Sequence, residues 1–373
     1  MAQTAAVSSA TLATLGSERL HALCHELGYS ASQTRSTVSL FQKLAGPWGQ
    51  RAVGLPPPWA SDITDDHSPY EFSLAVDGRA SELRFLIEVQ GHQPSLASNW
   101  AAARAMNEWL AEEYGVFLGR LALIEELFAP TQDRGRFAMW HAVCLRPGEP
   151  PDFKLYLNPQ ARGPTEARTL VETAMQRLGL GDSCAHLPAT GPDDALCYFS
   201  LDLSARPESR VKIYTAHSRA DVERIEAAIA SARGHVPGLV RDFCQTVGAS
   251  EGPFNARPVQ TCLAFVQGHV APKTATVYFP IRSYAANDRV AAHRILHSMP
   301  PESASTYSGA LEAFTDRRLE DGIGMQTYVS LRVEPGHRRL TVYLSPEVYE
   351  VMQSAMPVPT ALDVGARSGG VGQ

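Results

Sequence analysis

Ten segments with alternating apolar and polar residues occur along the chain as five neighbouring pairs. Short turns such as Asp77-Gly78 and Pro147-Gly148 join the members of a pair, and stretches with helical periodicity separate the pairs. A two-residue period is typical of strands with one buried face, and short turns join antiparallel neighbours. The predicted strands are residues 70–76 with 83–89, 137–145 with 152–158, 197–203 with 210–216, 261–267 with 275–281, and 325–333 with 339–345.

The segments between these pairs have the periodicity of helices, which we predict at residues 98–114, 164–178, 219–232, 288–297 and 302–314. Hairpins separated by helices favour an α+β fold and argue against the parallel βαβ arrangement of a Rossmann domain. One face of the strands is apolar throughout and suits a helical cover. We therefore expect a single closed antiparallel ten-stranded β-barrel of repeated α-β-β-α units, with the helices outside and the polar face around a lumen. An open sheet with its polar face in solvent is the alternative.

A recurring tyrosine favours the closed barrel. The second strands of four hairpins align as Lys154-x-Tyr156, Lys212-x-Tyr214, Thr276-x-Tyr278 and Thr341-x-Tyr343. Residues two apart share a face, and a face in solvent has no need of a tyrosine at the same place in each hairpin.

Composition limits the function classes and the domain organisation. The length of 373 residues fits two ordinary domains or one large barrel, and a net charge of -6 gives no basic field for nucleic acid. Six cysteines without a CxxC pair suggest reduced thiols and a cytoplasmic protein, and no apolar run is long enough to span a membrane. We expect a disordered N-terminus over residues 1–15, the barrel over 16–356, and a disordered glycine-rich tail over 357–373.

Four basic residues on the polar face point to an anionic ligand. In a shared lumen, Arg84, Lys154, Arg210 and Lys212 would be costly to desolvate without an anion, and a diphosphate would satisfy them. The chain has no Asp-Asp-x-x-Asp element, and its histidines lack metal-ligand spacing. We therefore predict a diphosphate site with no metal and no cofactor.

Aromatic and acidic residues on the same face suggest what happens next to that diphosphate. Tyrosine ring faces stabilise cations at about 2 kcal/mol each when water is excluded, so the tyrosines are candidates for shielding an allyl cation. Glu71 begins the first strand and is placed to accept a hydrogen bond from an indole N–H, although a salt bridge to Arg84 is an equal alternative. The four tyrosines are Tyr156, Tyr214, Tyr278 and Tyr343.

Four segments in this order resemble the dimethylallyltryptophan synthase family of indole prenyltransferases, particularly its bacterial members. The segments are DDHSPYEFS from Asp65, FKLYLNP from Phe153, RVKIY from Arg210 and VYLSPE from Val342. The resemblance implies a barrel of α-β-β-α units, Glu71 as the ligand of the indole nitrogen, the four cations as diphosphate ligands and the four tyrosines as the shield. Many relatives carry glutamine at the position of Thr276, which we therefore leave out of the site.

The expected activity is metal-independent transfer of a dimethylallyl, or a geranyl, group from its diphosphate to the indole ring of tryptophan or a tryptophan-derived metabolite. The reaction is a Friedel-Crafts alkylation, and His141 is a candidate for the base that removes the final ring proton. O-prenylation of a phenol such as tyrosine, and a non-catalytic barrel that binds a phosphorylated metabolite, are the alternatives.

Overall fold

The computed structural model describes residues 10–76, 81–131, 135–189, 191 and 193–353. Ten strands form one closed barrel in which every neighbouring pair is antiparallel. Strand β10 pairs with β1 and closes the ring, with Phe72 opposite Leu344 and Ala75 opposite Thr341. The strands are β1 Tyr70–Val76, β2 Ser81–Glu88, β3 Met139–Leu145, β4 Asp152–Leu157, β5 Asp194–Asp202, β6 Arg210–His217, β7 Val259–Val266, β8 Thr274–Phe279, β9 Gln326–Glu334 and β10 His337–Leu344.

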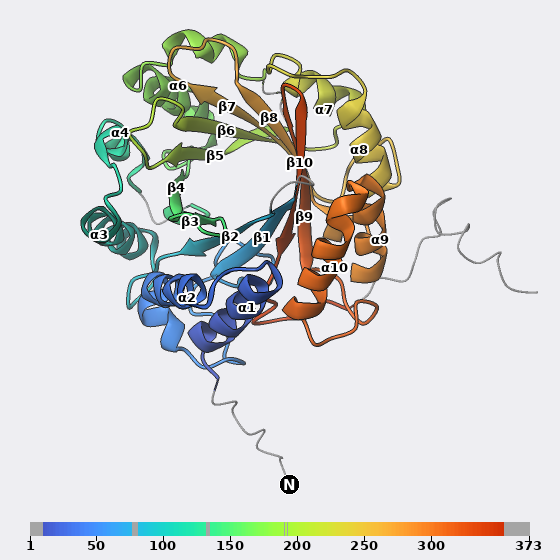
Figure 1. The fold of residues 1–373 in the computed structure, drawn as a ribbon. Helices are drawn as coiled ribbons and strands as arrows, with labels where there is room; N and C mark the ends of the chain where they lie inside the picture. The colour runs from blue at the N-terminus through green and yellow to red at the C-terminus, as the bar shows by residue number, and fades with distance from the viewer. Residues whose placement is uncertain (1–9, 77–80, 132–134, 190, 192, 354–373) are drawn as a thin grey trace, which may run out of the picture.

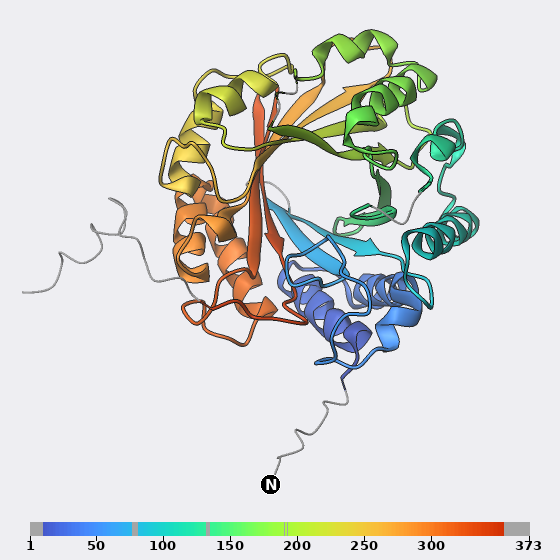
Figure 2. The same ribbon diagram turned by 180° about the vertical axis from the view of Figure 1, so that it is seen from behind.

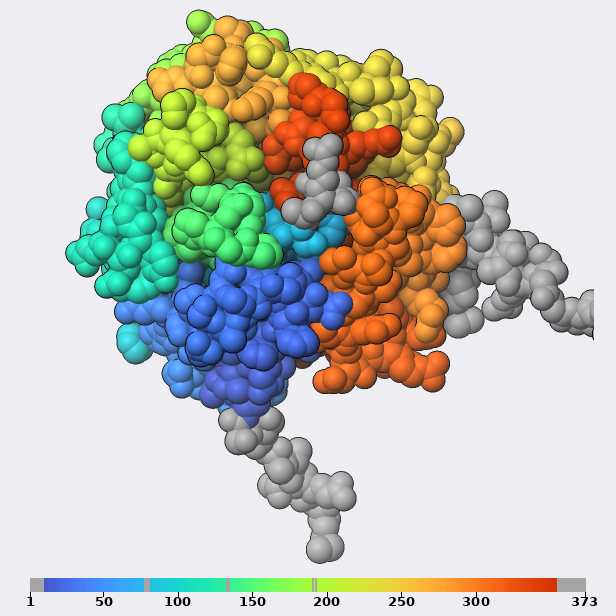
Figure 3. All heavy atoms as spheres, in the orientation of Figure 1, coloured from blue at the N-terminus to red at the C-terminus, as the bar shows by residue number. Residues whose placement is uncertain are grey.

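Helices surround this barrel, and the chain winds once around the axis from its first helix to its last (Figures 1 and 2). Helices α1 and α10 are in contact, so the outer layer also closes between the first and the last of the described helices (Figure 3). The described helices are α1 Leu12–Glu26, α2 Ala31–Ala45, α3 Leu96–Tyr114, α4 Gly119–Ala122, α5 Glu125–Phe128, α6 Ala167–Arg177, α7 Val222–Ile229, α8 Leu239–Gly248, α9 Asp288–Ser298 and α10 Pro301–Phe314. Short 3-10 helices occupy Gly46–Gln50, Pro164–Glu166, Gly181–His186 and Ile281–Ser283.

The predicted closed barrel of hairpins and helices is therefore confirmed. The predicted N-terminal boundary is wrong, because α1 begins at Leu12. The Thr11 side chain caps this helix by accepting a hydrogen bond from the Thr14 N–H, which a count of apolar residues does not reveal. Residues 1–9 and the predicted tail at 357–373 lie outside the described residues.

The main hydrophobic core lies between the barrel and its helices. Phe72 and Phe85 point outward from β1 and β2 and meet Phe41 of α2, with ring centroids 6.0 and 5.5 Å apart. All three side chains are fully buried. Since alternate strand residues point to opposite faces, this packing turns the polar residues of the same strands toward the lumen.

Two irregularities break this alternation. In β9 the register shifts against β10 between Val342 and Leu344, so Thr327 and Tyr328 both reach the inner side while Gln326 points to the helices. Strict alternation from Tyr328 and Ser330 would place Gln326 on the lumen face, so this prediction from the sequence is wrong. Bulges of this kind often redirect side chains near active sites. A second shift in β5, between Leu196 and Tyr198, places Cys197 among the lumen tyrosines.

Asp288, the first residue of α9, fixes the start of β9. Its fully buried carboxylate accepts hydrogen bonds from the Met325 and Gln326 N–H groups at 3.3 and 3.0 Å and forms an ion pair with Arg317. Replacing Asp288 with alanine leaves these donors and the arginine without their partner. We expect a loss of about 3–5 kcal/mol in the free energy of unfolding, measured by urea denaturation.

A matched substitution controls for the position of Asp288 in the first turn of its helix. Asp242 also lies in the first turn of a helix, α8, but is exposed. Asp242→Ala is expected to cost less than about 1 kcal/mol. Equal losses in the two variants would contradict the anchoring role of Asp288.

In the described part of the chain, none of the helices combines the length and apolarity that crossing a bilayer requires. The six cysteines are all free, and five of them are buried.

Candidate active site

Basic side chains concentrate at the end of the lumen where the hairpin turns lie, which we call the hairpin end. The four cations predicted from the sequence line one pocket there. The same pocket contains three further arginines that the sequence interpretation missed, although alternation from Ser330 places Arg332 on the same face. The basic residues of this pocket are Arg84, Arg146, Lys154, Arg210, Lys212, Arg332 and Arg339, and the acidic residue among its lining is Glu82.

Glu82 of β2 lines the same pocket and orients several of these cations. It is 2% exposed and forms ion pairs with Arg84, with Arg146 at 2.8 Å and with Arg339 at 3.4 Å. Burial opposes ionisation of Glu82, but Arg84 and the neighbouring cations hold its pKa well below the usual value. The predicted alternative of a Glu71–Arg84 salt bridge is therefore wrong, because Arg84 pairs with Glu82.

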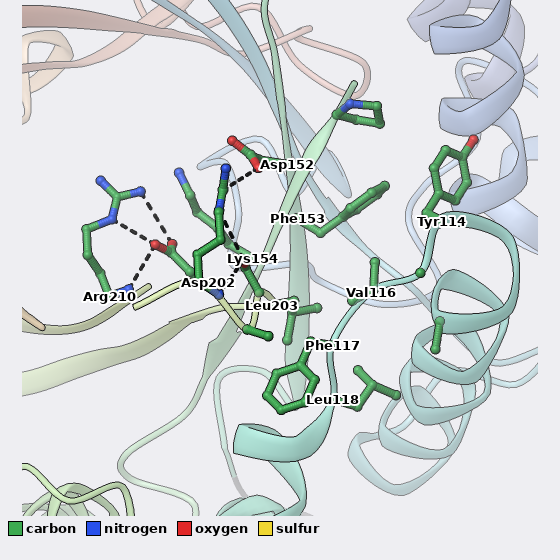
Figure 4. Close-up of a pocket in the computed structure, with 16 residues that line it drawn as sticks. Tyr114, Val116, Phe117, Leu118, Asp152, Phe153, Lys154, Asp202, Leu203 and Arg210 are labelled. Atoms are coloured by element: carbon green, nitrogen blue, oxygen red, sulfur yellow. Dashed lines mark hydrogen bonds and ion pairs between the residues drawn. The ribbon is translucent and has the colours of Figure 1, made fainter. Parts of the chain in front are cut away.

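Asp202 is the second counter-charge at this end. It binds Arg210 at 2.8 Å, and the pair lies beside Lys154 (Figure 4). Lys154 and Arg210 also border a cleft of about 700 Å³ that continues outward past Phe117 and Phe153. The cation cluster thus adjoins both the lumen and the outer surface.

Lys212 has no acidic partner among the described residues. Burial lowers its pKa well below the usual value, and the charges of Arg210 and Lys154 lower it further. Arg332 shows the same effect, with burial the first cause and Arg210 the second. A cluster in which cations depress one another's pKa is suited to bind an anion with several oxygen atoms.

The four predicted tyrosines form a continuous arc next to these cations. Ring centroids are 5.8 Å apart for Tyr156 and Tyr214, 5.5 Å for Tyr214 and Tyr278, and 5.8 Å for Tyr278 and Tyr343. Their hydroxyls meet at 3.3 Å between Tyr156 and Tyr214 and at 3.4 Å between Tyr278 and Tyr214.

Two further tyrosines extend the arc. Tyr198 lies 5.7 Å from Tyr214, and Tyr328 lies 6.5 Å from Tyr343. Both belong to first strands of their hairpins, so the repeated pattern of the second strands did not include them in the site. Electron-rich rings therefore surround the lumen beyond the cations.

Glu71 lies in the lumen on the side of the tyrosines away from the hairpin turns. Glu71 on β1 pairs with Leu86 on β2. Ser73, the next inward-facing residue of β1 toward the turn, pairs with Arg84. The Thr327 hydroxyl, placed by the bulge in β9, donates to Glu71 Oε1 at 2.6 Å. Burial raises the pKa of Glu71 to about 8, against the opposing effect of this hydrogen bond.

His141 does not belong to the lumen, which corrects the prediction for this residue. It is paired with Ile87 and Leu155, both on the helix-facing side of the barrel, and its Nε2 lies 2.9 Å from Asn107 Oδ1 in α3. Burial lowers its pKa to about 3. The inward-facing neighbours on β3 are Trp140 and Ala142, which pair with Tyr156 and Lys154.

No group of three or more metal-ligating side chains occurs in the part of the chain that the structure describes. Of the carboxylates that line the lumen, Glu82 forms ion pairs with arginines, and Glu71 accepts a hydrogen bond from the Thr327 hydroxyl.

A cation cluster, an arc of tyrosines and a buried glutamate in one ten-stranded barrel invite comparison with known enzymes. The family model for tryptophan dimethylallyltransferase matches residues 15–300. This chain belongs to that family. It is therefore an aromatic prenyltransferase, as the four sequence segments predicted.

Solved structures of the tryptophan dimethylallyltransferase family have the same architecture. The 6-dimethylallyltryptophan synthase from Micromonospora olivasterospora, in complex with DMASPP and Trp, is 33% identical, with 92% of this chain and 99% of that chain covered and a TM-score of 0.86. The 5-dimethylallyltryptophan synthase from Streptomyces coelicolor is 32% identical, with 92% and 100% covered and a TM-score of 0.86. The prenyltransferase PriB, in a ternary complex with L-tryptophan and dimethylallyl thiolodiphosphate, is 31% identical, with 94% and 100% covered and a TM-score of 0.88.

More distant relatives are fungal. The prenyltransferase anuH from Penicillium roqueforti is 37% identical over 78 residues, which span 20% of this chain and 17% of that protein. AnaPT from Neosartorya fischeri shares the fold, with a TM-score of 0.72 at 16% identity.

Proposed function

We propose that this prenyltransferase transfers a dimethylallyl group from its diphosphate to the indole ring of free tryptophan, without a metal ion. The observation that carries the proposal is the order of groups along the lumen: cations at the hairpin end, then tyrosines, then Glu71. This order suits a diphosphate, an allyl cation and an indole N–H in turn. The complexes of the Micromonospora and PriB relatives with tryptophan and a dimethylallyl analogue support the same pair of substrates.

In this proposal Arg84, Lys154, Arg210 and Lys212 bind the diphosphate, and each charge-assisted hydrogen bond contributes about 1.5–3 kcal/mol. The C–O bond to the diphosphate breaks, and its electron pair leaves with the diphosphate. The cations at the hairpin end stabilise the negative charge that develops on this leaving group.

The four-tyrosine arc shields the allyl cation and excludes water that would capture it. An indole carbon supplies the electrons of the new C–C bond, and the positive charge moves to the indole. Ionised Glu71 stabilises that charge through the N–H hydrogen bond. A base then accepts the ring proton, and the electron pair of the broken C–H bond restores aromaticity.

A non-catalytic carrier of phosphorylated metabolites is not favoured, because anion binding gives no reason for six tyrosines in contact beside the cations. O-prenylation of a phenol is also not favoured. A phenol O–H can also donate to Glu71, but the complexes of the Micromonospora and PriB relatives hold tryptophan, which favours an indole acceptor.

The direct test is incubation of purified protein with L-tryptophan and dimethylallyl diphosphate in excess chelator, followed by mass spectrometry. The proposal expects a product heavier than tryptophan by one C5H8 unit. Failure in chelator with recovery in magnesium would refute metal independence. Product from tyrosine but not from tryptophan would refute the indole acceptor.

The state of Glu71 gives the reaction a pH dependence. The carboxylate accepts the indole N–H bond more strongly than the neutral acid does and carries the charge that stabilises the cationic indole, and burial raises its pKa to about 8. The value of kcat/KM for tryptophan should therefore rise with pH and level off above about 8. A profile of kcat/KM from pH 6 to 9.5 measures this rise, which we call the acid limb of the profile.

Thr327→Val removes the hydrogen bond that favours the Glu71 carboxylate while keeping the side-chain shape. The pKa of Glu71 should rise, so the limb moves to higher pH and activity at neutral pH falls. Thr261 is also a buried strand threonine, but its hydroxyl lies 2.8 Å from His217 on the outer side, so Thr261→Val should leave the limb unchanged. If the acid limb lay at the same pH in the wild type, Thr327→Val and Thr261→Val, its assignment to the ionisation of Glu71 would be contradicted.

A further inference from the structure

The cleft of about 700 Å³ at the hairpin end of the barrel is not used by the reaction described above. We call it the rim cleft. Lys154 and Arg210 line both the rim cleft and the pocket of the cation cluster, so a group that they bind can extend in two directions. One direction leads inward to the four-tyrosine arc, and the other leads outward along the rim cleft (Figure 4). Its volume lies within the range of about 300–1,000 Å³ that is typical of small-molecule sites.

The end of strand β5 connects the cation cluster with the outer wall of the rim cleft. Asp202, the last residue of this strand, binds Arg210 at 2.8 Å. The next residue is Leu203, whose backbone N–H donates to the Phe153 carbonyl at 3.0 Å and whose carbonyl accepts from the Phe117 N–H at 3.3 Å. The apolar part of the rim cleft therefore begins one residue beyond the cations.

The outer wall of the rim cleft is apolar and open to solvent. Phe117 and Tyr114 line it and are 42% and 40% exposed. Val116 and Leu118 belong to the same wall. Gly119 leaves room for the Phe117 ring, because a Cβ atom at this position would lie 2.5 Å from the ring. An exposed apolar surface of this kind often marks a binding site.

The acidic side chains of the rim cleft are already paired with arginines. Asp152 forms ion pairs with Arg146 at 3.1 Å and with Arg206 at 2.7 Å, and Asp202 forms its pair with Arg210. An apolar chain can therefore pass these carboxylates without displacing water from an unpaired charge. A cationic end followed by an apolar wall matches a molecule with a polyanionic head and an apolar chain.

The inward direction gives little room to a chain longer than dimethylallyl. It passes the four-tyrosine arc and reaches Glu71, where the acceptor binds in the proposed function. A longer chain in the lumen therefore competes with the acceptor for the same space, whereas the rim cleft imposes no such limit.

We propose that the rim cleft binds the chain of long prenyl diphosphates, of the farnesyl class, while their diphosphate occupies the cation cluster. The inference rests on the proposed function, because it uses the same diphosphate site. A chain held in the rim cleft points away from Glu71, so its allylic carbon does not meet the indole. Long prenyl diphosphates thus occupy the donor site without reacting and inhibit dimethylallyl transfer competitively.

Calorimetric titration with farnesyl diphosphate, inorganic diphosphate and dimethylallyl thiolodiphosphate tests the inference. The wild type should bind farnesyl diphosphate about 10- to 100-fold more tightly than inorganic diphosphate, because the chain removes apolar surface from water. Phe117→Ser should lose most of this difference and keep its affinity for dimethylallyl thiolodiphosphate. Phe117→Leu, which keeps an apolar side chain, should retain most of the difference.

A matched control and an inhibition assay make the result specific. Leu123→Ser changes a leucine that is 51% exposed and lies outside the lining of the rim cleft, so it should bind farnesyl diphosphate as the wild type does. In wild-type kinetics, farnesyl diphosphate should raise KM for dimethylallyl diphosphate without changing kcat. The inhibition constant should rise about 10-fold in Phe117→Ser, in parallel with the lost affinity.

Three results would overturn the inference and leave dimethylallyl transfer intact. They are an affinity for farnesyl diphosphate no higher than that for inorganic diphosphate, equally tight binding of farnesyl diphosphate by the wild type and Phe117→Ser, and transfer of the farnesyl group to tryptophan as fast as that of dimethylallyl. The last two would place the chain in the lumen. If the wild type formed no product from dimethylallyl diphosphate and tryptophan, the proposed function itself would be refuted.

Discussion

Glu71→Gln is expected to lower kcat/KM for tryptophan by about 100-fold above pH 8, where Glu71 is ionised, because one preorganised group that stabilises developing charge is worth that order of rate. Glutamine keeps the size of the side chain and can still receive the Thr327 hydrogen bond, but it carries no charge to stabilise the cationic indole. The affinity for the donor should not change, because Glu71 is not part of the cation cluster. Turnover measured at saturating donor, together with donor binding by calorimetry, separates these two effects.

Glu88→Gln provides the matched control for Glu71. Glu88 is also a fully buried glutamate of the first hairpin, and burial raises its pKa to about 7. Its Oε2 accepts a hydrogen bond from Trp59 at 3.0 Å, so its role is to hold the segment that precedes β1. Glu88→Gln should retain most turnover. Full turnover in Glu71→Gln, with tryptophan binding unchanged, would eliminate the proposed role of Glu71.

Lys212→Met is expected to weaken the binding of dimethylallyl diphosphate by about 10- to 100-fold without destabilising the free protein. The ammonium of Lys212 has no acidic partner among the described residues, and its pKa is lowered by burial and by Arg210 and Lys154. The folded protein therefore binds fewer protons at this site than the unfolded chain, and stability from this group rises with pH. Removing the charge removes that penalty at neutral pH.

Two measurements check that Lys212→Met weakens donor binding without lowering the free energy of unfolding. Calorimetry with a non-hydrolysable thiolodiphosphate gives the donor affinity, and urea denaturation gives the stability of the free protein. Lys273→Met, at an exposed lysine, should change neither quantity. If Lys212→Met destabilised the protein by several kcal/mol and kept its donor affinity, Lys212 would be a structural residue and the account of the cation cluster would be wrong.

The barrel could be predicted from the sequence because apolar and polar residues alternate consistently along all ten strand segments. Residues such as Phe72 and Phe85 must be buried under helices, and the alternation then directs Arg84 inward without further information. The tyrosine arc follows from the same rule applied to second strands. These features depend on backbone geometry that is common to all strands.

The errors arise where local geometry departs from that rule or where the partner is distant in sequence. The register shift in β9 turns Gln326 outward and Thr327 inward, and nothing in the alternation of residues 325–333 indicates an extra residue. His141 has the chemistry of a base, but its neighbours on both adjacent strands are apolar residues that face the helices.

Arg257 lies in a connection before β7 that has no periodicity. Its ion pair with Asp65, 192 positions away, exists only in the folded chain. Sequence patterns therefore predict side chains on regular strands, such as Arg84 and Glu71, better than side chains in the connections between them.

The most direct test of the account is a crystal structure of this protein with L-tryptophan and dimethylallyl thiolodiphosphate. The account predicts diphosphate oxygens in contact with Arg84, Lys154, Arg210 and Lys212, the allyl group within the four-tyrosine arc, and the indole nitrogen within hydrogen-bond distance of Glu71. A diphosphate bound outside the hairpin end of the lumen, or an indole nitrogen directed away from Glu71, would contradict it.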